Sequence, residues 1–373
     1  MTKQGVLFLP PCVTEAEGLS IYRALAKVNR IIGELRSEFS HSIVNESLIQ
    51  MFSLKESVQS TRIEGTQVTF SEMVECVDEG RVSWQQREVL NYHRALRHGM
   101  EQIQQGYPIS TRLIKEMHRI LMEGARGTSA AGGEFRRIQN FIGPDNKIEH
   151  AVYISVSADA IDAYMENLEF FVAGTPHRSF QRYRVTDGAV LDETVDSVIK
   201  IAIMHAQFES IHPFLDGNGR LGRILIALLA VKEGLVDCPV FLVSEELERE
   251  RRRYYGLLNG IRGRSPDWHA WIMFFIEASG RMAEGLLQKM QEANALARGG
   301  LDRCELDSER SVWLYTFSRP VTTARMAADM CHVSPSTARK CLNLLAEKNL
   351  IYADESTQRN RRYTNYGLLR ILG

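Results

Sequence analysis

The sequence lacks the features of a zinc-ribbon, disulfide-linked or membrane-spanning protein. Its six cysteines are scattered, and no two of them form a CxxC pair, so neither a disulfide framework nor a zinc ribbon is indicated. The longest apolar run, from Ile224 to Val231, is far shorter than the ~20 residues that cross a bilayer. The start of the chain, with Lys3 and the Pro10-Pro11 pair, does not have the form of a secretory signal. We therefore expect a cytoplasmic protein without a membrane partner.

The chain also has no excess of either charge. Its 45 Lys and Arg residues almost balance 46 Asp and Glu residues, and the formal net charge is −1. This excludes a whole-molecule field that steers the protein to nucleic acid, so such a partner would have to meet a local patch. With 373 residues, of which 44% are hydrophobic, the chain has the composition of a globular protein of two or three domains.

Helical patterns dominate the chain from Thr14 onward. Apolar residues recur at helical spacing through 199–210 and 221–229. Strand signals are rare, and the one hairpin candidate before the C-terminal region is 151–156, which follows the turn-like segment 143–147. The patterns predict a mainly α fold with a helical bundle at its centre.

The composition changes towards the end of the chain. Small residues and paired glycines at 295–300 predict the end of a long helix and the start of a linker. Residues 321–373 then carry eight Lys or Arg residues and four acidic residues. We therefore expect a separate C-terminal domain at 299–373, after a central domain at 106–298 and an N-terminal region at 1–105.

The chemistry-bearing residues are concentrated in 212–223, which read His-Pro-Phe-Leu-Asp-Gly-Asn-Gly-Arg-Leu-Gly-Arg between two expected helices. Gly217 and Gly219 allow a ligand to approach the backbone closely. The start of the following helix offers free N–H groups and a partial positive charge. This junction predicts an anion site, and phosphate is the expected occupant.

Side chains of the same segment fit nucleotide chemistry. Arg220 and Arg223 are three residues apart, so they share a helix face and can grip neighbouring phosphates of a polyphosphate. Asp216 supplies the hard oxygen that Mg²⁺ prefers. His212 carries the one group here whose unperturbed pKa lies near neutrality, as a general base needs. A plain helix–loop–helix turn does not need all these groups together, so we favour a functional site.

Residues 212–223 resemble the signature of the Fic family, HPFxxGNGRxxR, without a departure at any specified position. The resemblance implies transfer of AMP from ATP to a hydroxyl side chain of a target protein, on Tyr, Thr or Ser. It implies that His212 deprotonates this hydroxyl and that Asp216 binds Mg²⁺ on the α- and β-phosphates. Members that move a whole phosphate carry Lys at the position of Gly219, so transfer of another phosphate-containing group is the minor alternative.

The remaining site residues that the resemblance implies surround the nucleotide. Phe214 would anchor the loop, and Gly217, Asn218 and Gly219 would hold the phosphates. Arg220 would contact the triphosphate and Arg223 its γ-phosphate. Tyr254 would contact the nucleoside. Some members have Asn eight residues after this tyrosine where this chain has Arg262, so the base selectivity stays open.

Residues 133–143 resemble the run ahead of the Fic flap, a hairpin that lays a target segment beside the active site by strand pairing. The hairpin candidate that follows Gly143 fits this use, because an exposed strand edge offers backbone groups to an extended peptide. A plain surface hairpin is the alternative.

Residues 60–65, Ser-Thr-Arg-Ile-Glu-Gly, match the Fic inhibitory motif of Ser or Thr, three residues, Glu, and then Gly or Asn. Gly65 is typical of the position after a helix end, where the charge of Glu64 opposes the helix dipole. In the class with an N-terminal inhibitory helix, Glu64 would pair with Arg223 and displace the γ-phosphate, and Ser60 would steady the glutamate. In some relatives this glutamate also positions a water that removes AMP. A solvated terminal glutamate is the alternative.

Residues 321–373 resemble a winged helix-turn-helix. Ser334 can cap a helix that begins at Pro335, and polar and basic side chains on that helix and in the wing suit phosphate contact in DNA. These residues are Ser336, Thr337, Arg339, Lys340 and Asn343 on the helix and Arg359 to Arg362 in the wing. The alternative is a module for contacts with a target or with a second copy of the chain.

Together the patterns predict a mainly α enzyme with three parts. They are a Fic-N region with the inhibitory helix at 1–105, a Fic catalytic bundle with a small β-hairpin flap at 106–298, and a winged helix-turn-helix at 299–373. The resemblance implies ATP, Mg²⁺ and a hydroxyl-bearing target protein, with the chain itself as a further target and with DNA or a homodimer as candidate partners. The competing interpretation is a DNA-binding regulator whose Fic unit senses nucleotide.

Overall fold

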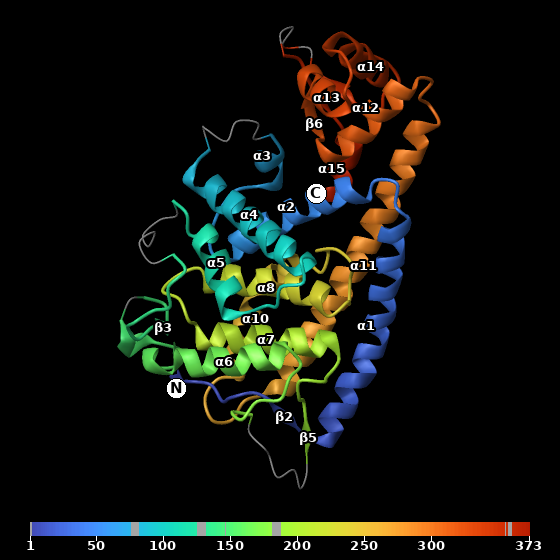
Figure 1. Ribbon diagram of the computed structural model, residues 1–373. Helices are drawn as coiled ribbons and strands as arrows, with labels where there is room; N and C mark the ends of the chain where they lie inside the picture. Colours follow the sequence, from blue (N-terminus) through green and yellow to red (C-terminus); the bar gives the residue numbers. More distant parts are fainter. Residues whose placement is uncertain are drawn as a thin grey trace. The chain divides into compact units, whose positions relative to one another are not determined.

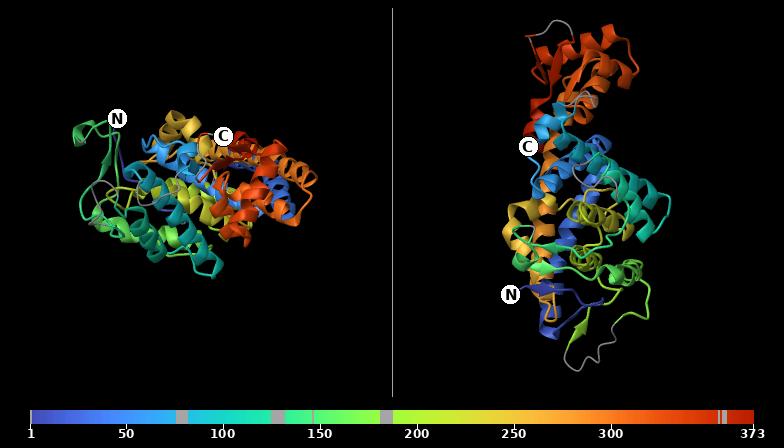
Figure 2. Two further views of the ribbon diagram at one scale, coloured as in Figure 1. Left: turned by 90° about the horizontal axis from the view of Figure 1, so that it is seen from above. Right: turned by 90° about the vertical axis from the view of Figure 1, so that its left-hand side faces the viewer.

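The computed structural model describes residues 2–75, 82–124, 132–145, 147–180, 188–354, 356 and 360–373. The chain divides into two compact units, and helices dominate both of them (Figures 1 and 2). The first unit comprises Met1–Gly33, Glu56–Gln67 and Ser83–Ala283, and the second comprises Glu34–Lys55, Val68–Val82 and Glu284–Gly373. The mainly α fold expected from the sequence is confirmed.

The helices that contribute to the first unit surround a central pair, α7 and α8. They are α1 (Glu15–His41), α2 (Asn45–Ile63), α4 (Trp84–Gln104), α5 (Thr111–Leu121), α6 (Ile161–Val172), α7 (Ser197–Ile211), α8 (Asn218–Lys232), α9 (Ser244–Arg249), α10 (Arg251–Gly260) and α11 (Trp268–Leu301). Helices α1, α2 and α11 also contribute to the second unit.

Helix α7 lies at the centre of the first unit, and every residue from Val198 to Ile211 is buried. It packs against α6, α8 and α10, while α8 also packs against α4 and α5. A helix that is apolar on all sides is stable only when neighbours cover all of it. The junction between α7 and α8 is therefore held by rigid elements on both sides.

The strands are short, and three of them build a small sheet beside the end of α7. Strand β3 (Phe141–Ile142) pairs antiparallel with β4 (Tyr153–Ile154), and β1 (Lys3–Gln4) pairs parallel with β4. The expected hairpin is confirmed, but β4 is its inner strand, because the start of the chain covers its other edge. Asn146, in the expected turn, lies outside the described residues.

Other short elements complete the first unit. Strand β2 (Cys12–Val13) pairs antiparallel with β5 (Ala189–Val190), and two 3₁₀ helices lie at Ile148–His150 and Ala158–Ala160. Among the described residues, no helix is long and apolar enough to cross a membrane.

The second unit holds α3 and the C-terminal elements of the chain. They are α3 (Phe70–Glu75), α12 (Asp307–Ser318), β6 (Val321–Thr323), α13 (Ala324–Cys331), α14 (Pro335–Glu347), β7 (Tyr352–Ala353), β8 (Arg362–Thr364) and α15 (Tyr366–Leu372). The three strands form an antiparallel sheet in the order β6-β8-β7, and α12, α13 and α14 pack together. We keep the winged helix as an interpretation of this arrangement.

The cap of α14 and the side chain of Asn343 bear on the winged-helix interpretation. The Ser334 hydroxyl accepts a hydrogen bond from the Thr337 amide at 3.1 Å, and Pro335 is the first residue of α14, as expected. Asn343 is half-buried and accepts a hydrogen bond from the Tyr363 hydroxyl at 2.8 Å, so its amide is used within the fold. Arg359 lies outside the described residues.

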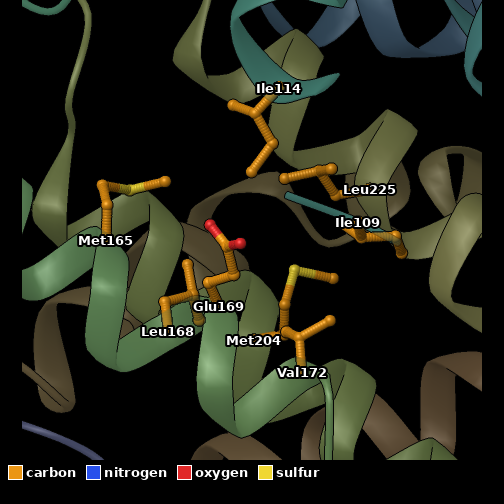
Figure 3. Close-up of a pocket in the computed structure, with 8 residues that line it drawn as sticks. All are labelled: Ile109, Ile114, Met165, Leu168, Glu169, Val172, Met204 and Leu225. Carbon is orange, nitrogen blue, oxygen red and sulfur yellow. The ribbon is translucent and has the colours of Figure 1, made fainter. Parts of the chain in front are cut away.

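A small apolar cavity lies between α5, α6, α7 and α8 (Figure 3). Its lining includes Ile114, Met165, Met204 and Leu225, and its one carboxylate, on Glu169, accepts a hydrogen bond from the Thr111 amide at 2.8 Å. None of the site residues expected from the sequence lines it. The cavity is a packing defect of the bundle and not the expected site.

The paired glycines of the expected linker lie inside α11, which ends only at Leu301. A Cβ atom on Gly300 would overlap the indole ring of Trp313, whose Nε1 donates to the Ala297 carbonyl at 2.9 Å. Gly299 faces open space. The linker therefore does not begin at these glycines, because Gly300 serves a close approach between α11 and α12.

We expect Gly300→Ala to destabilise the second unit. The rigid indole cannot yield easily to the added methyl group, and overpacking of this kind costs ~1–3 kcal/mol, which exceeds the ~1 kcal/mol that alanine gains over glycine in a helix. Calorimetric unfolding of the full chain measures the change. Gly299→Ala is the matched control and should leave the transition unchanged or raise it; equal midpoints for the two variants would contradict the packing role.

Candidate active site

Residues 212–217 form a loop between α7 and α8 that is bracketed by two residues in the left-handed conformation. His212 follows the last residue of α7 with φ 51°, and Gly217 precedes α8 with φ 79°. The His212 amide donates to the Phe208 carbonyl at 3.0 Å, which completes the end of α7. A positive φ is uncommon for a residue other than glycine, so the surroundings must hold His212 in place.

The loop is fixed from within by Phe214 and Asn218. Phe214 is fully buried and stacks on the His118 ring, with ring centroids 3.8 Å apart. Asn218 accepts from the Phe214 amide at 2.9 Å and donates to the Phe214 carbonyl at 2.9 Å. Both polar groups of the Asn218 side chain therefore close the loop. The contact of Asn218 with a phosphate, expected from the sequence, stays a prediction.

His118, on α5, is a supporting residue that the sequence analysis missed. Its Nδ1 accepts a hydrogen bond from the Gly133 amide at 2.9 Å, so its Nε2 carries the proton and donates to the Asp216 carbonyl at 3.0 Å. Burial lowers the pKa of His118 to about 4, so the ring is neutral. A lone histidine in a helical pattern gave no signal of this role.

The imidazole of His212 is arranged as a proton acceptor. Its Nδ1 lies 3.3 Å from the Glu209 carbonyl, which can only accept, so Nδ1 carries the hydrogen and Nε2 holds the lone pair. Nε2 has no hydrogen-bond partner among the residues that the structure describes. Burial, and then the Arg262 guanidinium, lower the pKa of His212 to about 4. At neutral pH the ring is therefore neutral and able to take a proton.

The start of α8 has the free amides that an anion site needs. The first N–H groups of a helix have no partners within it, and the Asp216 carboxylate turns back to accept from the Gly217 amide at 2.6 Å. A Cβ atom on Gly219 would overlap the carboxylate of Glu64, so this carboxylate fills the space that the glycine leaves. A carboxylate already lies where the helix start favours an anion.

Arg223 is the centre of a buried network. It is 1% exposed, and its Nη2 lies 2.6 Å from Glu64 Oε1. Its Nε donates to the Ser60 hydroxyl at 2.8 Å and its Nη2 donates to the Ser60 carbonyl at 2.9 Å. Ser60 therefore holds the arginine directly, whereas the sequence had suggested a contact with the glutamate. Burial opposes ionisation of Glu64, but the Arg223 charge prevails and lowers the pKa of Glu64.

Arg220 is buried beside the loop with unused hydrogen-bonding capacity. Its guanidinium lies 3.6 Å from the Asp216 carboxylate and 3.7 Å from the Glu88 carboxylate. Its Nε and Nη1 have no hydrogen-bond partner among the described residues. Buried N–H groups without a hydrogen bond are costly, and the ion pair of Nη1 with Glu88 at 3.7 Å is too long to supply one, so both groups can still donate to a ligand oxygen.

Tyr254, expected at the nucleoside, is held within the core beside the site, and its contact with a nucleoside stays a prediction. It is fully buried, and its hydroxyl forms a hydrogen bond with His205 Nε2 at 2.9 Å. Tyr255, the next residue on α10, is 41% exposed. Burial and the charge of Glu64 raise the pKa of the Tyr255 phenol. Because its ring is exposed, Tyr255 is a second candidate beside Tyr254 for a nucleoside contact.

Arg262, where some relatives have Asn, supports the end of α7. It is buried, its Nη2 donates to the Glu209 carbonyl at 3.2 Å, and its guanidinium lies 4.0 Å from the centre of the Tyr153 ring. The same Glu209 carbonyl is the partner of His212 Nδ1. Arg262 thus shares a backbone partner with the imidazole of His212. Its contacts give no reason to assign it to recognition of the nucleobase.

Comparison with known families agrees with this geometry. The family model described as Fic/DOC family matches residues 108–230, and the model described as Fic/DOC family N-terminal matches residues 22–101. The chain belongs to the Fic/DOC family. The Fic motif, on which the site is built, lies inside the first of these matches.

Individual relatives of this Fic/DOC chain are known from several organisms. A probable protein adenylyltransferase of Aquifex aeolicus is 52% identical over 95 residues, which cover 18% of this chain and 30% of that protein. Protein adenylyltransferase fic-1 of Caenorhabditis elegans is 27% identical over 245 residues, which cover 62% of this chain and 42% of the relative. The match therefore spans less than half the length of these two curated relatives.

A solved structure extends the likeness to nearly the whole fold. A Fic family protein from Desulfovibrio desulfuricans superposes with a TM-score of 0.55 at 20% identity, over 95% of this chain and 97% of that one. At this identity the comparison concerns the fold alone.

We expect the His212 ring to stay neutral down to about pH 5. Its lowered pKa of about 4 follows from burial and from the Arg262 charge, both of which disfavour the imidazolium. An NMR titration of the ring resonances, identified by their loss in His212→Gln, measures this directly. An inflection near the ordinary value of ~6.5 would contradict the neutral-ring arrangement.

Proposed function

We propose that this Fic/DOC chain is a protein adenylyltransferase that moves AMP from ATP to a hydroxyl side chain of a target protein, under restraint by Glu64. The curated relatives named protein adenylyltransferase support the reaction class. The observation that carries the proposal is the His212 imidazole, whose Nδ1 faces the Glu209 carbonyl and whose Nε2 has no hydrogen-bond partner among the described residues, beside a helix start against which the Glu64 carboxylate lies.

The chemical step follows from the His212 geometry. The target hydroxyl oxygen attacks the α-phosphorus of ATP, the bond from the α-phosphorus to the oxygen bridging to the β-phosphate breaks, and pyrophosphate leaves. Nε2 of His212 takes the hydroxyl proton and later releases it to solvent. The Glu209 carbonyl holds Nδ1 during this transfer, so the base is oriented before the target arrives.

The nucleotide would bind across the start of α8. The free amides of its first turn, the unpartnered N–H groups of Arg220 and the guanidinium of Arg223 are the donors for the phosphates. Asp216 would hold Mg²⁺, which neutralises phosphate charge when bound. An exposed single carboxylate fits this ion, because Mg²⁺ usually takes its other ligands from phosphates and water. No cluster of three or more metal-ligating side chains occurs in the described part of the chain.

Glu64 and the γ-phosphate compete for one site. The carboxylate holds Nη2 of Arg223 and lies against Gly219, so a phosphate that takes the same guanidinium must displace it. Two anions in this space would also repel each other. We therefore propose that Glu64 keeps ATP out of its productive pose, and that the same carboxylate serves AMP removal by positioning a water.

The three expected domains have separate parts in this proposal. Residues 1–105 supply the brake, 106–298 the chemistry and the flap, and 299–373 a winged helix. On α14, Arg339 and Lys340 are exposed, which favours contact with DNA phosphates over an apolar dimer surface. A regulator that only senses nucleotide is the competing function, and it would bind ATP without incorporating the α-phosphate into protein.

We expect His212→Ala to lower AMP transfer by ~10²–10⁴-fold, because a positioned base contributes about that factor. ATP binding should survive, since the phosphate donors lie on α8. The assay follows protein-bound label from ATP labelled at the α-phosphate, alongside a direct ATP-binding measurement. His41→Ala, an exposed histidine of α1, is the control. Undiminished labelling by His212→Ala would remove the histidine from the mechanism.

We expect Glu64→Gly to raise the labelling rate ~10-fold or more, because one hydrogen bond to a charged group stabilises the restrained state by ~1.5–3 kcal/mol. Self-labelling and labelling of lysate proteins are measured with the same ATP. Glu123→Gly, at an exposed carboxylate that pairs with Arg94 on the surface, is the matched control. A rate that stays equal or falls would speak against the brake.

A further inference from the structure

Arg136 is a buried arginine whose partners are backbone carbonyls. It is 3% exposed and has no carboxylate partner among the described residues. Its Nε donates to the His212 carbonyl at 2.9 Å and its Nη2 to the Ile211 carbonyl at 3.4 Å. The same guanidinium donates to the Ile138 carbonyl at 2.9 Å and to the Val156 carbonyl at 2.5 Å. One side chain therefore joins the end of α7 to both ends of the flap hairpin.

This arrangement is specific to a guanidinium. A buried cation is costly unless its donors are satisfied, and here the donors of a planar fork meet carbonyls from three separate backbone segments. A lysine ammonium has fewer N–H donors than a guanidinium, and they are not fixed in a plane, so lysine could not make the same set of hydrogen bonds. The positive charge also lies at the C-terminal end of α7, where it complements the helix dipole.

The contact matters because of the conformation of His212. A non-glycine residue stays at positive φ only when its surroundings hold it there. Arg136 supplies two of the holding contacts, since its side chain binds the His212 carbonyl and its own amide donates to the Pro213 carbonyl at 2.9 Å. A change at this point would rotate the imidazole away from the Glu209 carbonyl.

We propose that Arg136 is a positioning residue that couples the flap to His212, so that a target strand paired with the flap also fixes the imidazole for proton transfer. The proposal rests on the proposed function. When an extended segment pairs with β3, the ends of the hairpin become more rigid. The carbonyls of Ile138 and Val156 then fix the Arg136 guanidinium, which donates a hydrogen bond to the His212 carbonyl.

Arg136 also contributes to the electrostatics of the imidazole. The charges that act on His212 are Arg262 and Arg136, which lower its pKa, and Glu64, which raises it. Removal of the Arg136 charge should therefore raise the pKa of His212. This change can be measured without any turnover.

The test uses the full chain with Glu64→Gly as the parent, and it adds Arg136→Met or Arg136→Lys. Arg137→Met is the matched control, because Arg137 is the exposed neighbour of the same type. Four quantities are measured for each variant: protein labelling from α-labelled ATP, ATP affinity, the His212 pKa by NMR, and hydrogen exchange of the Val152 and Ser155 amides, which pair across the hairpin.

We expect both Arg136 variants to lower labelling by ~10²-fold, as small misplacements of catalytic groups do, at unchanged ATP affinity. Exchange at the hairpin amides should become faster in both. The pKa of His212 should rise in Arg136→Met and change less in Arg136→Lys, which keeps the charge but loses the fork. Arg137→Met should match the parent in every measurement.

Two results would overturn the proposal. One is labelling by Arg136→Lys equal to that of Arg137→Met. The other is a parallel fall of labelling, ATP affinity and thermal midpoint, which shows a structural role only. Failure of the proposed function is distinguished by His212→Ala in the same parent. If that variant labels normally the base assignment fails, while the His212 pKa and the hairpin exchange still report whether Arg136 couples the two segments.

Discussion

The site depends on one interaction, the pairing of the buried Arg223 guanidinium with an anion. Arg223 is almost inaccessible to water, and, unlike Arg136, it has a carboxylate as well as a carbonyl among its partners, which offsets the cost of its buried charge. Glu64 is the partner in this structure, and a phosphate is the other anion that the start of α8 favours. Ser60 binds the arginine through its hydroxyl and its carbonyl. In the proposed function the arginine therefore keeps its place while the anion is exchanged, and Glu64 and the γ-phosphate are alternative occupants of one preformed position.

Rigid surroundings explain how the loop keeps its shape in either state. Helix α7 is buried on all sides, Phe214 is stacked on His118, and Asn218 closes the loop on both polar groups of the Phe214 backbone. Burial also keeps the rings of His118 and His212 neutral. The imidazole of His212 and the loop backbone are thus oriented before any reaction. Less rearrangement of the protein is then needed when charge develops in the transition state.

The sequence predicted the parts of this site that depend on local pattern. The α7–α8 junction and the hairpin after Gly143 could be inferred from local pattern, and the pairing of Glu64 with Arg223 was implied by the resemblance to the Fic family. Other features depend on contacts between distant segments. Two-residue strands such as β1 leave no periodicity to read. Adjacent tyrosines at 254 and 255 differ only in which one faces the core, and the partner of Ser60 is decided by the reach of Arg223. The packing of Gly300 on Trp313 is equally invisible in composition, so paired glycines were taken for a linker.

Control of the proposed reaction is divided between two arginines that lie at opposite ends of the loop. In this proposal Arg223, on α8, binds either Glu64 or a phosphate, whereas Arg136, ahead of the flap, holds the backbone carbonyl of His212. Glu64 bonds the first and leaves the second untouched, so the brake acts on the nucleotide without disturbing the orientation of His212. Because β1 covers one edge of β4, the outer edge of β3 remains for a target strand. Nucleotide and target would then be admitted through separate contacts, and the loop would join their effects at the histidine.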